Sequence, residues 1–502
     1  MKRGEHEGSS GTGRKENSAR LFLKPFPRAA ALASDPVIKG MRSIAVQEGA
    51  AAYLAGGVLR NLALSRPPAP DYDFVSGGDI KKISERAARM FKGASFLLDK
   101  ETPSYRVVVK ARGRRRAVVL DFSPIKGGGV TEDLKARDFT VNALGISLDE
   151  AFSGEPRVLD PTGGLKDAAK KVLRAASSGV FDEDPLRVMR AVRISQQYGL
   201  KIARETLALM RSKAGLLSSV SRERVRDELI LMFSCPGTVR SVELMYGCGI
   251  IDAILPEAGG WAKLDGYNLK AHALATLAEV EFIIEGVTSG EYLAPFPGLL
   301  AYLRGSIGPL SRIALLKLAA FFHDAGKPLA ISRESGRLRF IGHDDRGAPV
   351  VKEMMTRLRF SGKAAKELAS MVRNHHRAFM LADLKEPTPR ARAHFFRAAG
   401  GEPGLLLLLL ALADARATRG EEDTELLAVA AAMFSFYWGQ YTRRRPKPIL
   451  GGREIMKAFK VPEGGLVGEI IGKISEGVEK GVVTDRKEAI AYVREWLKSR
   501  KA

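Results

Sequence analysis

A chain of 502 residues is long enough for about three domains, because domains average roughly 150 residues. Its composition, 45% hydrophobic and 27% charged, is that of a globular protein. With 80 Lys and Arg against 57 Asp and Glu, the formal net charge is +23, which argues against an ordinary metabolic enzyme and favours a polyanionic partner, either nucleic acid or an anionic membrane surface.

Other features of the sequence exclude further classes. The longest purely apolar run, Leu405–Ala413, is far shorter than the ~20 residues that a membrane span requires. The polar N-terminus has no apolar stretch of the signal-peptide type. Two cysteines, Cys235 and Cys248, argue against a disulfide framework or a cysteine-based zinc site. We therefore expect a cytoplasmic protein that does not enter a membrane.

The N-terminal third of the chain predicts a small mixed α/β unit behind a tail. Residues 1–22 are too polar to bury enough apolar surface and are predicted to be a disordered basic tail. Residues 23–150 hold short apolar runs that predict strands at Tyr53–Ala55, Arg106–Val109 and Val118–Phe122, and a helix at Ile80–Phe91. The last two runs flank Arg112–Arg116, which predicts a hairpin with a strongly basic tip.

From about Lys166 onward the apolar pattern has a helical period, interrupted by Gly and Pro. We expect a helical connector over residues 151–240 and a larger helical body over 241–440. The basic stretch Thr442–Pro448 predicts a linker into a small C-terminal unit, 441–502. The fold class expected from this order is α+β, with a small mixed sheet followed by helices.

Gly56 and Gly57 follow the first predicted strand, and Asp71 and Asp73 begin another. Two glycines after a strand let the backbone approach a phosphate closely, with N–H groups free to point at it. Residues two apart on a strand share a face, so both carboxylates project together and repel each other. A divalent cation is the usual compensation. An Asp-rich turn is the simpler alternative.

Asp121 lies in a third predicted strand and can supply another carboxylate beside the first two. Three carboxylates from two strands, next to a Gly-Gly turn, suit two Mg²⁺ ions, one activating an attacking hydroxyl and one holding a triphosphate leaving group. Arg60 and the basic hairpin tip can meet the phosphates.

The order of these segments is similar to that of one known family, the class II tRNA nucleotidyltransferases (CCA-adding enzymes) and the bacterial poly(A) polymerases related to them. The matching segments are Gly56-Gly57 with Asp71 and Asp73, then Arg137–Ala143, Asp160–Leu165 and Glu183–Arg187. The resemblance extends from about residue 50 to the C-terminus. It implies a nucleotidyltransferase head of the polymerase-β type, followed by a neck, a body and a tail that contacts RNA.

The resemblance also implies roles for individual residues. Asp71 and Asp73 would be the metal ligands, with Asp121 as the third carboxylate. The nucleotide-binding residues would be Gly56, Gly57 and Arg60 for the triphosphate, and Arg137, Asp138 and Asn142 for the sugar and phosphates. Three departures are visible: Asn61 stands where the family usually has an aspartate, the Pro67–Pro70 segment is one residue longer than usual, and the loop after Asp121 is short.

Asp184 and Arg187 are predicted to open a helix whose first residue is Pro185 and whose end is near Gly199. Cytosine and adenine both present an amino donor beside a ring-nitrogen acceptor, so a carboxylate and a guanidinium can recognise either base and reject uracil and guanine. The family assigns this motif that role. A helix cap with a surface partner is the simpler alternative.

Two further arginines, Arg190 and Arg193, continue the same helix face and can meet the RNA end or the nucleotide phosphates. The segment Arg222–Glu228 resembles the last neck motif of the family, for which we expect a mainly structural role.

Six of the seven histidines fall within the helical body, and the order of five of them resembles that of the HD phosphohydrolase superfamily. His323-Asp324 ends the apolar helix Leu315–Phe322, and Asp414 is expected to close another helix, Leu405–Ala413. The resemblance implies one metal, Mg²⁺ or a transition metal, on the first His, the His-Asp pair and the last Asp, with a second on the intervening histidines. The candidate ligands are His272, His323, Asp324, His343, His375, His376 and Asp414.

The leading prediction is template-independent addition of nucleotides to the 3′ end of tRNA from CTP and ATP, with release of pyrophosphate. An HD-type metal-dependent phosphohydrolase and a noncatalytic RNA-binding protein are the alternatives from other classes. The short segment between Asp121 and Arg137 leaves CCA addition and CC addition both open, because the family members that use a longer loop here switch from CTP to ATP. Polyadenylation is ranked lower, since the segment Tyr105–Arg116 lacks a histidine typical of many bacterial poly(A) polymerases.

Overall fold

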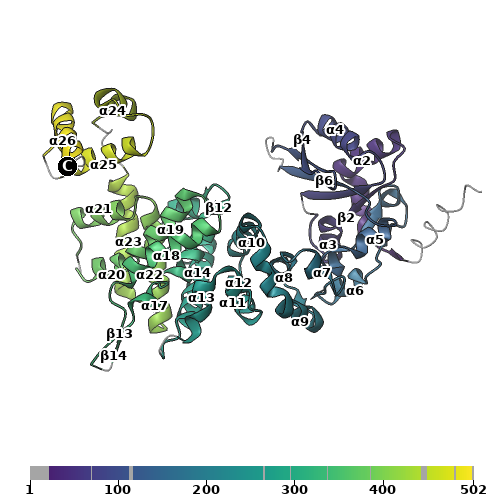
Figure 1. Ribbon diagram of the computed structural model, residues 1–502, viewed down its shortest axis with the longest axis horizontal. Helices are drawn as coiled ribbons and strands as arrows, with labels where there is room; N and C mark the ends of the chain where they lie inside the picture. The colour runs from purple at the N-terminus through teal and green to yellow at the C-terminus, as the bar shows by residue number, and fades with distance from the viewer. Residues whose placement is uncertain are drawn as a thin grey trace, which may run out of the picture.

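The computed structural model describes residues 22–68, 70–111, 117–263, 266–293, 296–335, 337–384, 386–442, 449–479 and 482–499. It is an elongated molecule in which a mixed α/β head and a helical body lie at opposite ends of a helical neck (Figure 1). A three-helix tail packs at the far end of the body. The expected disordered tail 1–22 (apart from Phe22), the basic hairpin tip Arg112–Arg116 and most of the linker Thr442–Pro448 lie outside the described residues.

The head is built on an eight-stranded mixed sheet with the strand order β1-β8-β7-β2-β3-β6-β5-β4. The pair β3 and β6 is parallel, and the other neighbouring pairs are antiparallel. The strands are β1 (Leu23–Pro25), β2 (Ala52–Ala55), β3 (Asp71–Ser76), β4 (Ala94–Asp99), β5 (Ser104–Val109), β6 (Val118–Pro124), β7 (Gly145–Ser147) and β8 (Arg157–Leu159). The helices of the head are α2 (Pro36–Gln47), α3 (Gly57–Ala63), α4 (Ile80–Phe91) and α5 (Val130–Lys135).

The predicted strands and the helix α4 are confirmed, and the antiparallel pair β5–β6 confirms the predicted hairpin. The expected end of the head at residue 150 is wrong, because β8 completes the same sheet beyond that position. Such a short strand carries little pattern of its own. It is held by pairing with β1, where Leu23 lies opposite Leu159.

The neck is helical, as predicted, and begins with short elements that pack against the head. Its elements are α6 (Gly164–Ala169), β9 (Val172–Leu173), α7 (Val180–Glu183), α8 (Arg187–Tyr198), β10 (Lys201–Ile202), α9 (Arg204–Lys213), α10 (Arg222–Ser234), α11 (Thr238–Gly247), α12 (Ile250–Ile254) and α13 (Pro256–Gly259). Helix α8 ends at Gly199, whose φ of +65° provides the left-handed conformation common after a helix.

The body surrounds the almost wholly buried helix α22, and the tail forms a separate small unit (Figure 1). The body helices are α14 (Leu269–Ser289), α15 (Pro297–Leu303), α16 (Arg312–Phe322), α17 (Lys327–Ala330), α18 (His343–Arg357), α19 (Gly362–Asn374), α20 (Arg377–Ala382), α21 (Pro389–Ala398), α22 (Pro403–Arg419) and α23 (Thr424–Phe436), followed by a π-helical segment, Tyr437–Tyr441. Two short hairpins join them: β11–β12 (Ser306–Ile307, Leu310–Ser311) and β13–β14 (Ser332–Glu334, Arg337–Arg339). The tail consists of α24 (Gly452–Phe459), α25 (Gly465–Glu479) and α26 (Arg486–Ser499).

The buried apolar residues of the described chain form two large hydrophobic cores and a small one in the head, around Ala55, Val75 and Leu134. One continuous core extends from Phe26 in the head through the neck to Tyr437 in the body. The tail has its own core, which includes Leu450, Ile474 and Val493. In the part of the chain that the structure describes, no single helix is both long and apolar enough to cross a membrane. Helices α21 and α22 together have the required length and composition, but the pair is bent by 98°.

Candidate active site

The turn between β2 and α3 is built on Gly56, which has a φ of +72°. A Cβ atom at this position would lie 2.5 Å from Oδ2 of Asp73 and 2.9 Å from Nη1 of Arg137. Only glycine therefore fits between the chain and these two side chains. At Gly57 the nearest atom to such a Cβ, Nη2 of Arg60, is 3.6 Å away, so this position is sterically open.

The three predicted carboxylates lie on adjacent strands, as expected. Asp73 on β3 is the direct neighbour of Asp121 on the parallel strand β6, and Asp71 is two residues before Asp73 on the same strand. Burial raises the pKa of both Asp71 and Asp73, and the negative charge of Asp121 adds to the effect. Crowded carboxylate oxygens whose charged state is disfavoured are suited to a hard divalent cation such as Mg²⁺.

Arg106 on β5 is a member of this group that the sequence analysis did not identify. Its Nε and Nη2 donate to the two carboxylate oxygens of Asp121, at 2.7 and 2.8 Å. The positions are directly opposite in the antiparallel β5–β6 pair. The alternation of the predicted hairpin could have revealed this pairing if its register had been assigned.

Two arginines next to the Gly56 turn have buried N–H donors that are available to an anion. The Nε atoms of Arg60 and Arg137 are buried and have no hydrogen-bond partner within the described residues. Burial lowers the pKa of Arg60, whose hydrogen-bond partners are all neutral: Oδ1 of Asn142 at 2.9 Å, Oδ1 of Asn61 at 3.2 Å and the hydroxyl of Tyr198. A buried guanidinium without a carboxylate partner is favourable where an anionic ligand neutralises it.

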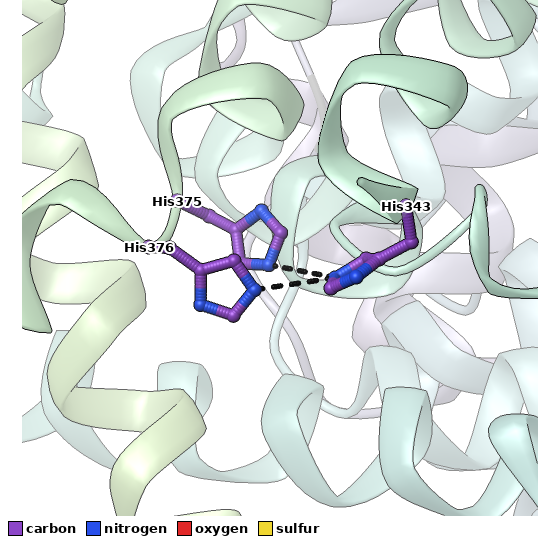
Figure 2. Close-up of side chains that lie close together, drawn as sticks. All are labelled: His343, His375 and His376. Atoms are coloured by element: carbon purple, nitrogen blue, oxygen red, sulfur yellow. Dashed lines mark hydrogen bonds between the residues drawn. The ribbon is translucent and has the colours of Figure 1, made fainter. Parts of the chain in front are cut away.

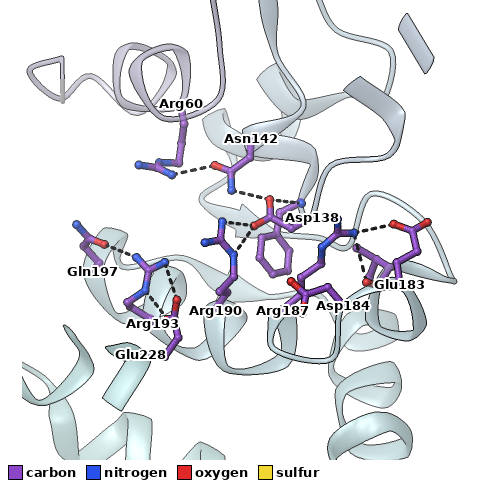
Figure 3. Close-up of polar contacts among 12 residues, drawn as sticks. Arg60, Asp138, Asn142, Glu183, Asp184, Arg187, Arg190, Arg193, Gln197 and Glu228 are labelled. Atoms are coloured by element: carbon purple, nitrogen blue, oxygen red, sulfur yellow. Dashed lines mark hydrogen bonds and ion pairs between the residues drawn. The ribbon is translucent and has the colours of Figure 1, made fainter. Parts of the chain in front are cut away.

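A continuous set of hydrogen bonds connects this turn to the neck (Figure 3). Arg60 donates to Asn142, Asn142 donates to Oδ1 of Asp138 at 2.8 Å, and Arg190 donates to Oδ2 of Asp138 at 2.6 Å. Burial opposes ionisation of Asp138, but Arg190 and Asn142 outweigh it and lower the pKa of this carboxyl. Three predicted residues of the head and one of helix α8 are thus brought together in one polar network.

Asp184 and Arg187 lie at the start of α8, where the backbone N–H of Arg187 donates to the carbonyl of Asp184 at 3.0 Å, but their side chains take different partners (Figure 3). The α-helix begins at Arg187, not at Pro185, because the turn before it is closed by 3₁₀-type bonds, in which the N–H groups of Arg187 and Val188 donate to the carbonyls of Asp184 and Pro185 at 3.0 Å. Oδ1 of Asp184 accepts from the backbone N–H of Leu186 at 3.2 Å, and Arg187 donates to Glu183 at 2.9 Å. These are the contacts of the simpler cap-and-partner alternative, and they leave lone pairs and N–H groups free for a base.

Arg193 differs from the other predicted residues of α8. Its Nε donates to Oε2 of Glu228 at 2.6 Å, and the two side chains are only 15% and 8% exposed. The guanidinium of Arg193 is therefore engaged in a buried ion pair between α8 and α10, while Arg190 faces the head.

In the body, the predicted histidines and aspartates converge from different helices. Ligand atoms of His272, His323 and Asp414 lie within 4.8 Å of one another, as do those of His343, His375 and His376 (Figure 2). Asp324 connects the two groups, with Oδ2 at 3.3 Å from His272 and Oδ1 at 2.9 Å from His343. The expected position of Asp414 at a helix end is wrong, since α22 continues to Arg419.

The hydrogen bonds of the histidines determine which ring nitrogens are available. Nδ1 of each central histidine lies at 2.6–2.9 Å from a backbone carbonyl three residues earlier, so Nδ1 carries the proton and Nε2 the lone pair. These histidines are His323, His343 and His375. Facing Nε2 atoms are 3.3–3.4 Å apart in the second group. Lone pairs that face each other at this distance are repulsive unless a cation lies between them, so the group fits a metal that prefers imidazole ligands.

Charge in this cluster is unevenly distributed. Burial opposes protonation of His272, but Asp324 and Asp414 outweigh it and raise its pKa to about 9. Burial lowers the pKa of His375 to about 3, with its histidine neighbours adding to the effect. Lys327, which the sequence analysis did not identify, places Nζ 2.6 Å from Oδ2 of Asp324. Lys327 follows Asp324 by three residues, across the turn between α16 and α17, so the pair is local in sequence.

Comparison with known proteins gives a consistent picture over almost the whole chain. Three families match: "Poly A polymerase head domain" over residues 52–174, "Probable RNA and SrmB- binding site of polymerase A" over 199–259 and "HD domain" over 298–419. The CC-adding tRNA nucleotidyltransferase of Geobacter sulfurreducens is 33% identical over 92% of this chain and 95% of its own. The A-adding tRNA nucleotidyltransferase of Deinococcus radiodurans is 31% identical over 89% and 95%.

A solved structure of a CCA-adding enzyme with ATP covers 95% of this chain and 99% of its own, with a TM-score of 0.59 and 18% identity. At this identity the likeness establishes the fold, which is the predicted head, neck, body and tail arrangement.

Proposed function

The chain belongs to the tRNA nucleotidyltransferase family, and we propose that it is a CC-adding member, which attaches two cytidylates from CTP to the 3′ end of tRNA. Addition of nucleotides to tRNA 3′ ends is the activity of the family. The restriction to cytidylate is the part of the proposal that needs testing.

The connection between β6 and α5 is the observation that carries this restriction. Only residues 125–129 lie outside the two elements, and the backbone N–H groups of Ile125 and Lys126 donate to Ser76 and to Asp133, at 3.1 and 3.2 Å. Family members that switch from CTP to ATP use a longer loop here. A short connection fixed by hydrogen bonds leaves little slack for such a rearrangement.

The site residues have distinct proposed roles. The turn at Gly56-Gly57, Arg60 and Arg137 bind the triphosphate of CTP, while Asp138 and Asn142 orient the sugar. Asp184 accepts from the amino group of cytosine, and Arg187 donates to its ring nitrogen. Mg²⁺ bound by Asp71, Asp73 and Asp121 would supply Lewis-acid activation of the 3′-hydroxyl and the phosphates. The 3′ oxygen forms a bond to the α-phosphorus as the bond to pyrophosphate breaks.

The decisive experiment is extension of tRNA transcripts that end before the triplet or after its two cytidines, with CTP, ATP or both. Addition of two cytidines, unaffected by ATP, supports the proposal. Three additions identify a full CCA-adding enzyme, and extension only of the transcript that already ends in CC identifies an A-adding enzyme. A long homopolymer identifies a poly(A) polymerase. Each of the last three results contradicts CC addition.

Asn61 gives a prediction about the strength of triphosphate binding. An aspartate at this position would place a carboxylate near Nη2 of Arg60, now 3.2 Å from the amide oxygen, and would neutralise its charge. We expect Asn61→Asp to raise KM for CTP about fivefold, which corresponds to about 1 kcal/mol, with little change in kcat. Steady-state kinetics of Asn61→Asp and Asn61→Ala test this. An equal rise in KM for both variants would show that the introduced charge is not the cause.

A second activity, hydrolysis of phosphomonoesters or cyclic phosphates, is proposed for the histidine cluster of the body. Its support is the convergence of imidazole and carboxylate donors, which suits a divalent transition metal better than Mg²⁺, although either fits the residue types. In this proposal, bound metal holds the phosphate, and Lys327 supplies positive charge beside it.

Asp324→Asn tests the body site separately from the head, because Asp324 touches both histidine groups. We expect loss of bound transition metal, measured by elemental analysis, and loss of hydrolysis of p-nitrophenyl phosphate or a 2′,3′-cyclic nucleotide. Nucleotide addition should remain within about twofold of wild type, since the two sites are distant. Asp345→Asn, an exposed carboxylate on the same side of the body, is the control. Full metal content in Asp324→Asn would contradict the assignment.

The remaining proposals concern partners, place and boundaries. We propose tRNA and CTP as partners, with ATP as the second donor in the CCA alternative, and the cytoplasm as the location. The unit 441–502 is proposed to contact the body of the tRNA through the starts of α24, α25 and α26. The boundary at residue 240 between neck and body remains a proposal, as does the boundary at 440 between body and tail.

A further inference from the structure

Helix α10 contributes a contact to the proposed base-reading pair that the sequence analysis treated as structural. Nη2 of Arg224 on α10 donates to Oδ2 of Asp184 at 2.7 Å. The two residues are 40 positions apart in the chain. Within the described residues, this is the one hydrogen bond or ion pair that holds the side chain of Asp184 from another segment.

The backbone around Asp184 does not fix its carboxylate. Residues 184–186 lie between α7 and α8, and Asp184 has φ −148° and ψ 100°. Its other contact is the 3.2 Å hydrogen bond from the N–H of Leu186, two residues later. A side chain held only by this local bond can rotate away from a base, so Arg224 determines its orientation.

Arg187, the other member of the pair, is positioned differently. Its guanidinium donates to Glu183 at 2.9 Å and to the carbonyl of Val180 at 3.3 Å, both in the preceding helix α7. Removal of Arg224 would therefore disturb the acceptor for the amino group of the base and leave the donor to the ring nitrogen in place.

Arg224 itself extends from a firmly held helix. One turn along α10, Glu228 makes the buried ion pair with Arg193, so α10 is held to α8 as well as to the segment before it. Toward the body, Nη1 of Arg226 donates to the carbonyl of Arg359 at 2.7 Å. The guanidinium of Arg224 is thus presented from a support anchored on both sides.

We propose that Arg224 is a positioning residue for nucleotide selection, which holds the Asp184 carboxylate where it accepts from the amino group of cytosine. This inference rests on the proposed function, because it requires Asp184 to read the base. The hydrogen bond from Arg224 leaves Asp184 able to accept from the base, since each carboxylate oxygen has a further lone pair. Selection against uracil, which presents a carbonyl in place of the amino group, depends on this placement.

The test compares Arg224→Ala, Arg224→Lys and the wild type in single-nucleotide addition from CTP and from UTP. Loss of one charge-assisted hydrogen bond should raise KM for CTP about tenfold and lower the preference for CTP over UTP by about the same factor. The value of kcat at saturating CTP should change little. Arg224→Lys should recover part of the preference, because it restores the charge with a single donor site. Arg222→Ala is the matched control, as this neighbouring arginine contacts only the carbonyl of Ser218.

Three outcomes would overturn the inference. Equal losses with CTP and UTP would mean that Arg224 only stabilises the neck. Weaker binding of tRNA with unchanged preference would make it an RNA contact, and unchanged kinetics would make the ion pair incidental. If the wild type itself accepts UTP as well as CTP, the base-reading role of Asp184 fails, and with it the proposed function. The wild-type measurement therefore separates the two failures.

Discussion

Replacement of Asp71 and Asp73 together by alanine is expected to abolish nucleotide addition and leave tRNA affinity nearly unchanged. Both carboxylates lie at the start of β3 beside Asp121, where burial raises the pKa of each. Without them, the hard cation that the site is suited to hold has too few oxygen ligands. Gel extension measures the addition, and filter binding measures the affinity for tRNA.

The control for this loss is Asp149→Asn, which alters an exposed carboxylate of the head paired with Arg42. It should retain full addition. Residual activity above about one per cent of wild type in the Asp71/Asp73 double variant would contradict the assignment of these carboxylates as essential metal ligands.

Gly56→Ala is expected to reduce addition from CTP by at least about a hundredfold, because displacement of a reacting group by about 1 Å costs this much. The added Cβ would lie 2.5 Å from Oδ2 of Asp73 and 2.9 Å from Nη1 of Arg137. The φ of +72° adds strain for any other residue. One methyl group is therefore expected to displace together Asp73, the proposed metal ligand, and Arg137, which is proposed to bind the triphosphate. Single-turnover kinetics with saturating CTP measures the effect.

Gly57→Ala is the matched control, since a Cβ there has no neighbour closer than 3.6 Å and the residue begins helix α3. Thermal melting of both variants shows whether the head still folds. We expect Gly57→Ala to retain most of the activity. A comparable loss in both variants would mean that close approach of the ligand to the backbone, and not displacement of Asp73, is what the glycines provide.

The sequence was sufficient to predict what depends on local pattern. The alternation around Asp71 and Asp121 identified β3 and β6, and the period of Ile80–Phe91 identified α4 with its observed ends. In each case a single segment carried enough pattern to determine its own conformation. The candidate ligands of the body cluster came instead from the resemblance of its His and Asp order to the HD phosphohydrolase superfamily.

Contacts between segments were not predictable in the same way. Nothing in the sequence around Arg106 or Arg224 marks either arginine as part of the site. The register of β5 against β6 shows that Arg106 pairs with Asp121, and the position of α10 shows that Arg224 pairs with Asp184. The start of α8 was placed too early, because proline favours the first turn of a helix, but Pro185 and Leu186 form a 3₁₀-type turn and the α-helix begins at Arg187. Strand β8 was missed since its three residues are stabilised by a partner, β1, far away in sequence.

The division of the hydrophobic residues into one core from head to body and another in the tail has a thermodynamic consequence. Segments that share a continuous apolar interior unfold together, whereas a unit with its own interior can open alone. A substitution that leaves a cavity in the neck is therefore expected to lower the melting temperature of the head and of the body as well. The tail melts as an independent cooperative unit, so its sequence can diverge or be exchanged without cost to the stability of the catalytic part.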